Sequence, residues 1–299
     1  MPAEPVGRVD ILLSIKSDRA FAWLRDDPAF ITLLARLNLG SNAQRAMSDA
    51  FNHAILHETE HRPWPMPDSP WIMTQTWHDL LFAHWPVAID TLRPLVPPVF
   101  PIDLFDRQAW LGIVPFRMTN VAPRGVPAVP WLSAFPELNV RTYVTVDGRP
   151  GVYFFSLDAG NPVAVRLARR LARLPYFTAT MACTARDGWI HYRSLRKPGG
   201  PAARFEARYR PAGPPVPPSP GSLEYFLTER YRLYTTGPSA APYSLDIHHP
   251  PWPLQPADAG IVANTMAEAA GLTLASGAPL LHFARRQDMV AWPLRRLSA

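Results

Sequence analysis

Residues 135–158 carry the clearest two-residue periodicity in the chain. From 136 to 146, apolar and β-branched residues at most even positions alternate with polar residues at the odd positions. Alternation of this kind is typical of a β-strand with two unlike faces. Asp147-Gly148 follows, a pair that tolerates the positive φ of a tight turn, and a second strand-like segment covers 152–158. The segment therefore predicts a β-hairpin.

The length of the turn decides which side chains of this hairpin share a face. A loop of two or four residues would bring odd positions of the first strand and even positions of the second onto one face, whereas three or five residues would break that register. The shared face would then carry these side chains: Glu137, Asn139, Arg141, Tyr143, Phe154, Ser156 and Asp158. It is either a solvated surface or the lining of a polar cavity.

Three of these residues are the candidate catalytic groups. In this register Glu137 and Asp158 lie opposite each other, and two buried carboxyl groups raise the pKa of one of them, as in a general acid–base pair. Arg141 either binds a substrate carboxylate by two parallel hydrogen bonds or neutralises the two acids within a structural network. The candidate ligand-binding residues are Asn139, Tyr143, Phe154, Ser156 and, from an earlier segment, His84, which is either a general base or a packed polar aromatic.

Composition excludes several other classes of protein. All but two of the 30 basic residues are arginines, and they are scattered along the chain, which indicates codon bias rather than a nucleic-acid-binding patch. No run of about 18 apolar residues is present, so no membrane partner is expected. The single cysteine, Cys183, excludes an intrachain disulfide and a cysteine metal cluster, and a cytoplasmic location is the default.

Residues 1–66 are predicted to form a helical arm with a proline-rich linker, and 67–299 the main domain. The arm contains the sequence His-Glu-Thr-Glu-His at 57–61, which matches a zinc-binding pattern in which two histidines share a helix face. His53, His57 and His61 are therefore weak metal candidates. The alternative is a polar helix end with solvated histidines, because Pro63 ends the helix directly after the motif.

The rest of the chain predicts many short strands and few helices. Helices are expected at 162–172, 223–230 and 258–270, and strands at 110–118, 177–184, 189–194, 203–210, 231–235, 243–248 and 279–294. This pattern indicates an α+β fold that is mainly antiparallel β. We expect the sheet to close into a barrel or cone, with peripheral helices and the N-terminal helical arm.

Several motifs occur in the order found in one family: His-Trp-Pro at 84–86 and the segments 135–144, 151–159, 174–177, 221–234 and 248–254. On these motifs, residues 71–295 resemble the YqjF-like family of uncharacterised bacterial proteins. The resemblance implies the acetoacetate decarboxylase-like fold, a β-cone that encloses a polar pocket. It does not imply the decarboxylase reaction, which needs a lysine that forms a Schiff base. Lys16 lies in the arm, and Lys197 lies in a loop-like segment.

The sequence thus predicts a polar internal pocket that binds, and in an enzyme would transform, a small organic molecule with a carboxylate or keto group. No cofactor is expected, and the sequence leaves open whether the protein is an enzyme. One alternative is a non-catalytic ligand-binding or scaffold protein whose arm mediates assembly into a homo-oligomer. A weaker alternative is a zinc site at His57 and His61.

Overall fold

The computed structural model describes residues 54–124, 128, 133–274 and 276–297. The strands are β1 (Met73–Val87), β2 (Ala109–Pro123), β3 (Phe135–Val146), β4 (Arg149–Ala159), β5 (Tyr176–Arg186), β6 (Trp189–Arg196), β7 (Arg204–Pro211), β8 (Arg232–Thr236), β9 (Pro242–His248), β10 (Gln255–Asn264), β11 (Leu280–Ala291) and β12 (Arg295–Arg296). The α-helices are α4 (Ile89–Leu92), α6 (Pro162–Leu171), α7 (Leu223–Thr228) and α8 (Met266–Ala269), and 3-10 turns cover Arg93–Leu95 and Pro238–Ala240. Residues 1–53, with the first weak metal candidate His53, lie outside the described residues.

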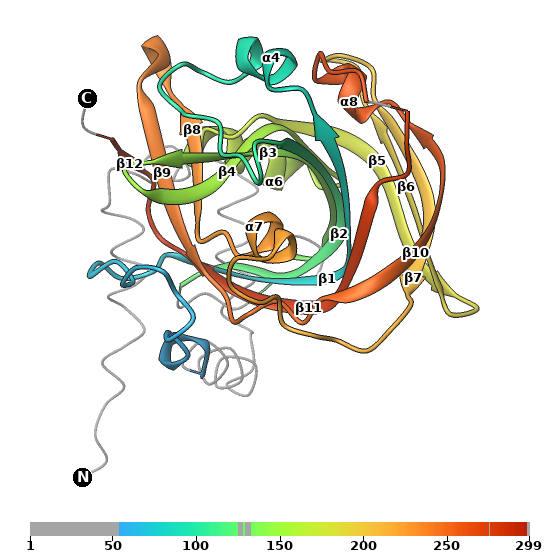
Figure 1. Cartoon of the computed structure of the whole chain (residues 1–299), viewed down its shortest axis with the longest axis horizontal. Helices are drawn as coiled ribbons and strands as arrows, with labels where there is room; N and C mark the ends of the chain where they lie inside the picture. The colour runs from blue at the N-terminus through green and yellow to red at the C-terminus, as the bar shows by residue number, and fades with distance from the viewer. Residues whose placement is uncertain (1–53, 125–127, 129–132, 275, 298–299) are drawn as a thin grey trace, which may run out of the picture. The chain divides into compact units, whose positions relative to one another are not determined.

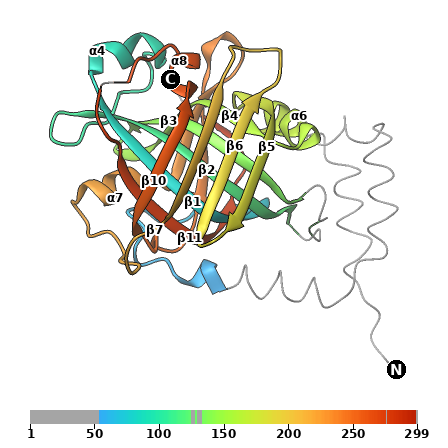
Figure 2. The same cartoon turned by 90° about the vertical axis from the view of Figure 1, so that its right-hand side faces the viewer.

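The strands form one sheet in the order β12-β9-β8-β4-β3-β2-β1-β11-β10-β7-β6-β5, with additional pairings of β9 with β11 and of β4 with β5. The strand pairs are antiparallel except that β4 runs parallel to both β5 and β8. Figure 1 shows α7 inside the curve of the sheet, between β1–β3 and the strands β8 and β9. Figure 2 shows β10, β7, β6 and β5 side by side. The fold is therefore mainly β, as the sequence predicts.

Strands β1, β2 and β3 are buried on both faces because each face meets a different core. Successive side chains of a strand point to opposite faces. Leu81 and Ala83 of β1 pack into a core that β6, β7 and α8 complete, whereas Leu80 and Phe82 pack with Trp252 in a second core. Burial on both faces accounts for the apolar run around residue 81, which a strand with one solvated face would not need. Within the described residues, no helix is long and apolar enough to cross a membrane.

The hairpin of β3 and β4 forms with a two-residue loop, and Asp147 and Gly148 adopt φ angles of 51° and 68°. The predicted register holds next to this loop, where Arg141 pairs with Phe154. It then fails, because Val140 pairs with Ser156 and a β-bulge absorbs the residue between. Beyond the bulge the parity is reversed, so the predicted pairing of Glu137 with Asp158 is wrong: Glu137 pairs with Ala159.

Two of the three predicted helices are confirmed. The side chain of Asn161 accepts hydrogen bonds from the first turn of α6, and Ser222 does the same for α7. The predicted helix at 258–270 is wrong, because most of that segment belongs to β10 and only Met266–Ala269 is helical. Its alanines favour a helix whereas its isoleucine and valine favour a strand, and pairing with β7 decides the conformation.

Candidate functional site

A row of side chains crosses three neighbouring strands beneath α7. His84 of β1 pairs with Gly112 of β2, and Gly112 pairs with Arg141 of β3. Because Gly112 has no side chain, His84 and Arg141 meet above it: a Cβ atom there would lie 3.0 Å from His84 Nε2 and 3.3 Å from Arg141 Cγ. Tyr143, two residues along β3, contacts His84 with 2.7 Å between its hydroxyl oxygen and Nε2. We call His84, Arg141 and Tyr143 the β1–β3 site.

The end of α7 fixes two of these side chains from above. The carbonyl oxygen of Leu227 accepts hydrogen bonds from the Tyr143 hydroxyl at 3.0 Å and from Arg141 Nη2 at 3.1 Å. Since the Tyr143 proton goes to Leu227, His84 Nε2 donates to the Tyr143 oxygen and carries the ring proton. Nδ1 of His84 is then a lone-pair acceptor, and it is buried without a hydrogen-bond partner among the described residues.

Burial and neighbouring positive charge keep His84 neutral. The residue is fully buried, and burial, followed by the charges of Arg141 and His282, lowers the pKa of His84 well below its usual range. Burial also raises the pKa of the Tyr143 hydroxyl. The site therefore contains a neutral imidazole and a neutral phenol at physiological pH, and these groups can accept and donate a proton.

Arg141 is a partly buried cation without an acidic partner. Among the described residues no carboxylate lies within ion-pair distance of it, and its buried Nε atom has no hydrogen-bond acceptor. The nearby Arg230, by contrast, is neutralised by Asp103 at 2.6 Å. The guanidinium of Arg141 lies over the Phe82 ring, 5.4 Å from its centroid, which contributes a weak cation–π attraction. Burial of an unpaired charge is costly, so an anionic ligand at Arg141 would be strongly favoured.

His282 of β11 also lies near this site, although it was not among the residues predicted from the sequence. Phe82 of β1 pairs with this residue, and His282 Nε2 lies 3.8 Å from Glu224 of α7. Burial lowers the pKa of His282, and its buried Nδ1 has no partner among the described residues. The run Leu281-His282-Phe283 alternates within a predicted strand and was the available signal, but only the pairing of β11 with β1 brings it to the site.

Glu137 and Asn139 lie farther along β3, on the face that carries Arg141 and Tyr143. The Tyr176 hydroxyl donates a 2.9 Å hydrogen bond to the buried Glu137 carboxyl group. Burial raises the pKa of Glu137 to about 8, and the charge of Asp158 is only a minor contribution. Asn139 Oδ1 is buried without a hydrogen-bond partner in the described part of the chain. These two residues extend the polar row but do not contact His84.

Two of the remaining candidates, Ser156 and Asp158, lie beyond the bulge, and the third, Phe154, pairs with Arg141 on the near side of it. Asp158 accepts hydrogen bonds from Arg196 Nε and Nη2 at 2.7–3.0 Å, and the two side chains are 0% and 1% exposed. This buried ion pair connects β4 to β6 and occupies the Asp158 carboxylate. Ser156 is buried on the far side of the bulge, and Phe154 lines a different hollow beside α6. The expectation of one shared face is therefore corrected: the bulge divides it.

The zinc-binding pattern is not arranged as the sequence suggested. The helix there ends at His57, so His57 and His61 do not share a helix face. His61 Nε2 contacts the carbonyl oxygen of His249 at 2.8 Å, and the ring of His61 stacks on that of His248. Among residues 54–124, 128, 133–274 and 276–297, no group of three or more histidine, cysteine or acidic side chains could hold a metal ion.

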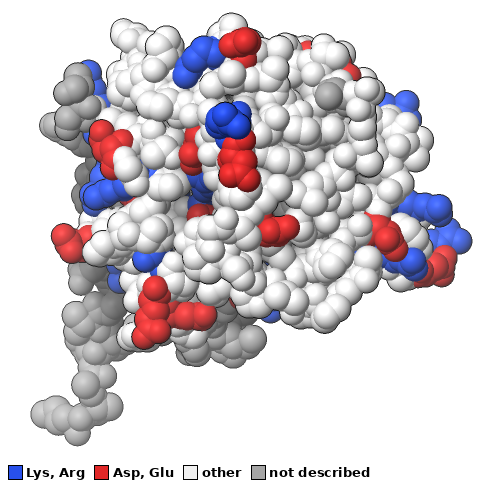
Figure 3. All heavy atoms as spheres, in the orientation of Figure 1, with Lys and Arg blue, Asp and Glu red and all other residues white. Residues whose placement is uncertain are grey.

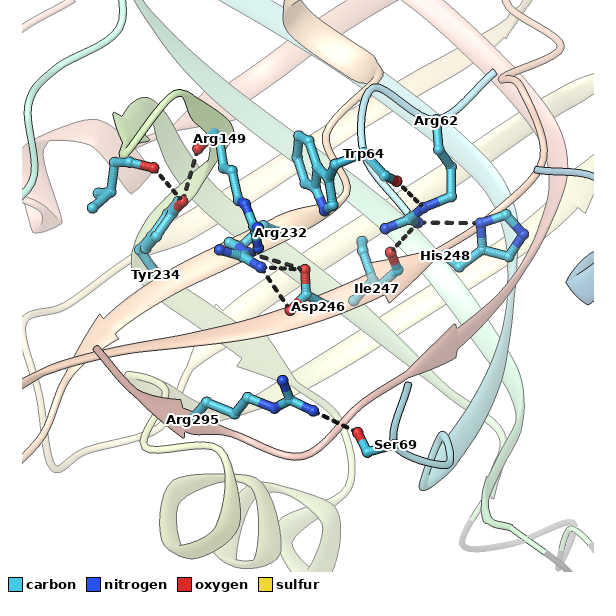
Figure 4. A network of polar contacts seen from close by, with 11 residues as sticks. Arg62, Trp64, Ser69, Arg149, Arg232, Tyr234, Asp246, Ile247, His248 and Arg295 are labelled. Carbon is cyan, nitrogen blue, oxygen red and sulfur yellow. Dashed lines mark hydrogen bonds and ion pairs between the residues drawn. The ribbon is translucent and has the colours of Figure 1, made fainter. Parts of the chain in front are cut away.

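Residues next to this pattern attach the segment before β1 to β9. Figure 4 shows Arg62 beside His248, with Nη1 of Arg62 3.2 Å from His248 Nδ1 and 2.8 Å from the carbonyl oxygen of Ile247. Burial lowers the pKa of His248 to about 3, so the ring is neutral in this contact. Arg232 and Asp246 form a mostly buried ion pair in the same view. The contacts of His61, Arg62 and His248 are those of a structural joint.

The face of the molecule in Figure 3 carries basic and acidic side chains interspersed over a mostly uncharged surface. A nucleic-acid-binding surface typically gathers lysine and arginine on one face. Arginine is therefore scattered over this face, as it is along the sequence.

Comparisons with known proteins place the chain in a family. Residues 74–288 match the family DUF2071, described as an uncharacterized conserved protein. The chain is 52% identical over 233 residues to the uncharacterized protein YqjF of Bacillus subtilis (strain 168), covering 78% of this chain and 96% of that protein.

Two solved structures share its fold. The acetoacetate decarboxylase of Legionella pneumophila superposes with a TM-score of 0.54 at 13% identity, covering 82% of this chain and 95% of that chain. The enduracididine biosynthesis enzyme MppR, complexed with pyruvate, gives 0.53 at 12% identity, covering 80% and 93%. The fold is therefore acetoacetate decarboxylase-like, and by sequence the chain belongs to the DUF2071 family of YqjF-like proteins.

Proposed function

We propose that this protein binds a small organic acid, with a keto group beside or near the carboxylate, at the β1–β3 site. The observation that carries the proposal is Arg141, a partly buried cation with no acidic partner in the described residues and a buried Nε donor left without an acceptor. A ligand carboxylate supplies both the missing charge and the missing acceptor. A guanidinium binds a carboxylate through two parallel hydrogen bonds, which also orients the ligand.

The surroundings of Arg141 suit the rest of such a ligand. Phe82 and the partly exposed Trp110 and Phe226 supply apolar surface, and Trp110 Nε1 is a buried donor with no partner in the described part of the chain. His84 Nδ1 and His282 Nδ1 are further unpartnered polar atoms. Pockets for small ligands typically combine apolar walls with a few convergent polar groups. We also propose that the pairings of β4 with β5 and β9 with β11 close the sheet into a cone around the β1–β3 site.

The chemistry that such a site supports is proton transfer next to a carbonyl group. Neutral His84 would accept a proton from the carbon beside the keto group through Nδ1, and Tyr143 would hold the ring in the required tautomer. A lysine Schiff base is not part of the proposal, because Lys197 is exposed after β6 and Lys16 lies outside the described residues. The MppR structures with pyruvate, and with the condensation product of pyruvate and imidazole 4-carboxaldehyde, support a keto acid as the ligand class for this fold.

The first test measures binding of pyruvate and acetoacetate by calorimetry to three proteins: wild type, Arg141→Gln and Arg285→Gln. Arg285 is exposed and pairs with Asp79, so Arg285→Gln controls for the loss of one positive charge. We expect Arg141→Gln to weaken binding at least tenfold and Arg285→Gln to leave it unchanged. Acetone lacks the carboxylate, so its affinity for each variant should equal its affinity for wild type. Equal affinities of wild type and Arg141→Gln for both acids would refute the proposal.

A second measurement separates an enzyme from a binding protein. Exchange of the methyl protons of pyruvate with deuterated water, followed by NMR, reports proton abstraction directly. We expect exchange with wild type and its loss in His84→Gln, provided that this variant melts at a similar temperature. Binding of pyruvate without proton exchange would indicate a ligand-binding protein that does not catalyse this reaction. Assembly through residues 1–66 remains a separate prediction.

A further inference from the structure

A hollow of about 370 Å³ lies where β4 changes its neighbour. β4 runs parallel to β8 at Val152 and Tyr153, and parallel to β5 only from Leu157 onward. Between these points, residues 154–156 have no strand on that edge within the described part of the chain. Beyond Tyr153, β8 no longer pairs with β4, and β5 joins β4 only at Leu157. We call this hollow the β4 fork; its lining residues are Tyr153, Phe154, Arg169, Arg173, Leu174, Pro175, Thr235, Thr236, Gly237 and Pro238.

The β4 fork combines apolar walls with two cations. Tyr153 and Phe154 of β4 supply aromatic surface, and Arg169 and Arg173 approach from the end of α6. Neither arginine has an acidic partner among the described residues. The volume of the fork is at the lower end of the range for small-molecule sites.

Both guanidinium groups are held in place by contacts that leave their charge unneutralised. Arg173 lies over the Tyr243 ring at 4.9 Å and passes above Gly237, where a Cβ atom would lie 3.1 Å from its Nη1. Arg169 donates from Nε to the Tyr176 carbonyl oxygen at 2.6 Å. Fixed cations lose less side-chain entropy when they bind an anion than freely rotating ones do.

We propose that the β4 fork is a second binding site, for a small anion that carries a flat apolar ring: an aryl phosphate or an aryl carboxylate. Arg169 and Arg173 contact the anionic group, and Tyr153 and Phe154 contact the ring. The β4 fork shares no residue with the β1–β3 site, although Phe154 pairs with Arg141 across β3 and β4. It assigns a role to Phe154, a ligand candidate of the sequence analysis that the β1–β3 site does not use.

The test measures binding of phenyl phosphate, benzoate and inorganic phosphate by saturation-transfer NMR and calorimetry. The double variant Arg169→Gln/Arg173→Gln is compared with Arg166→Gln, which removes an exposed arginine of the same helix outside the hollow. We expect wild type to bind an aryl anion more tightly than inorganic phosphate. The double variant should lose at least tenfold in affinity, and Arg166→Gln less than twofold. Comparison of the affinities for phenyl phosphate and benzoate shows whether the site prefers a phosphate or a carboxylate.

Two further variants keep the outcome interpretable. Phe154→Leu should weaken binding of the aryl anion and leave inorganic phosphate unchanged, because only the ring contacts Phe154. Arg285→Gln, at the exposed pair with Asp79, should leave all three affinities unchanged. The other variants change α6 and the β4 fork and leave the β1–β3 site intact, so a failure of the proposed function does not decide this one. The β4 fork is refuted if no aryl anion binds wild type at millimolar concentration. It is also refuted if Arg166→Gln weakens binding as much as the double variant does.

Discussion

At the scale of single residues, burial sets the charge of the groups that line β3. His84 and Glu137 are both buried, and burial favours the neutral form of each: it lowers the pKa of the histidine and raises that of the acid. Arg141, on the same strand as Glu137, has no carboxylate partner among the described residues and a buried Nε without an acceptor. This unpaired guanidinium is the physical basis of the proposed ligand class.

Glu137 predicts a pH-dependent stability. Its pKa is raised from 4.5 to about 8, so between these values the folded protein keeps a proton that the unfolded chain has lost. The free energy of unfolding then decreases as pH rises, by up to about 1.4 kcal/mol per pH unit from this group. Glu137→Gln cannot ionise and still accepts a hydrogen bond from Tyr176. We expect the free energy of unfolding of this variant to match that of wild type near pH 5 and to be larger by roughly 3 kcal/mol near pH 8.

Urea unfolding at pH 5, 6.5 and 8 measures this difference. The buried His249, with a pKa lowered to about 3 by burial, contributes the opposite slope below pH 6.5, but it does so equally in both proteins and cancels. Glu206→Gln, at a half-exposed site on β7, is the control. The hydrogen bond from Arg204 lowers the pKa of Glu206, so this residue stays ionised from pH 5 to 8 and the variant should run parallel to wild type. A constant difference between Glu137→Gln and wild type across the range would contradict the prediction.

At the scale of secondary structure elements, the β-bulge in β4 and the glycine in β2 determine which side chains meet. The bulge sends Asp158 to Arg196 and leaves Glu137 with Tyr176. Gly112 allows two large side chains from the flanking strands to approach over its position. Neither feature changes the number or order of the strands, yet both decide the composition of the site.

Gly112→Ala tests the second feature. The new methyl group would lie 3.0 Å from His84 Nε2, so His84 has to move away from Tyr143. We expect a loss of about 1–3 kcal/mol in the free energy of unfolding, as for other overpacked core positions, together with weaker binding at Arg141. Gly260→Ala on β10 is the matched control, because its methyl group would lie 3.7 Å from Arg208.

Urea unfolding and the calorimetric titration with pyruvate measure both effects. Gly260→Ala should be neutral or slightly stabilising, since alanine costs less backbone entropy than glycine in a strand. If Gly112→Ala were as stable as Gly260→Ala and bound pyruvate as wild type does, the close approach over Gly112 would not matter to the site.

At the scale of the whole molecule, a few buried ion pairs connect strands that are distant in the sequence. Asp158 and Arg196 join β4 to β6 with almost no exposed surface. Removal of one partner leaves the other charge buried and unpaired, and such changes cost about 3–5 kcal/mol. We expect that loss for Asp158→Asn in thermal or urea unfolding.

The exposed pair of Arg210 with Asp258 connects β7 to β10 and provides the control, because both side chains are nearly half exposed. Solvent screens exposed pairs, so Asp258→Asn should cost less than about 1 kcal/mol. Similar losses for Asp158→Asn and Asp258→Asn would show that the buried pair has no special role in holding β4 to β6.

The sequence by itself determined what depends on local pattern. Alternation predicted the hairpin and placed Arg141 and Tyr143 on one face of β3, and capping residues predicted α6 and α7. These features follow from neighbours within a few residues, where side-chain direction and backbone preference are fixed by spacing. His84 was also a candidate on its residue type alone.

Only the tertiary structure decided which candidates meet. The bulge separated Glu137 from Asp158, pairing with β7 turned a predicted helix into β10, and β11 brought His282 beside Phe82. The pattern His57–His61 lost its helical face where the chain turned toward β9. Each outcome depends on pairing between segments far apart in the chain, and the period-two pattern of a strand carries no information about the register of its partner.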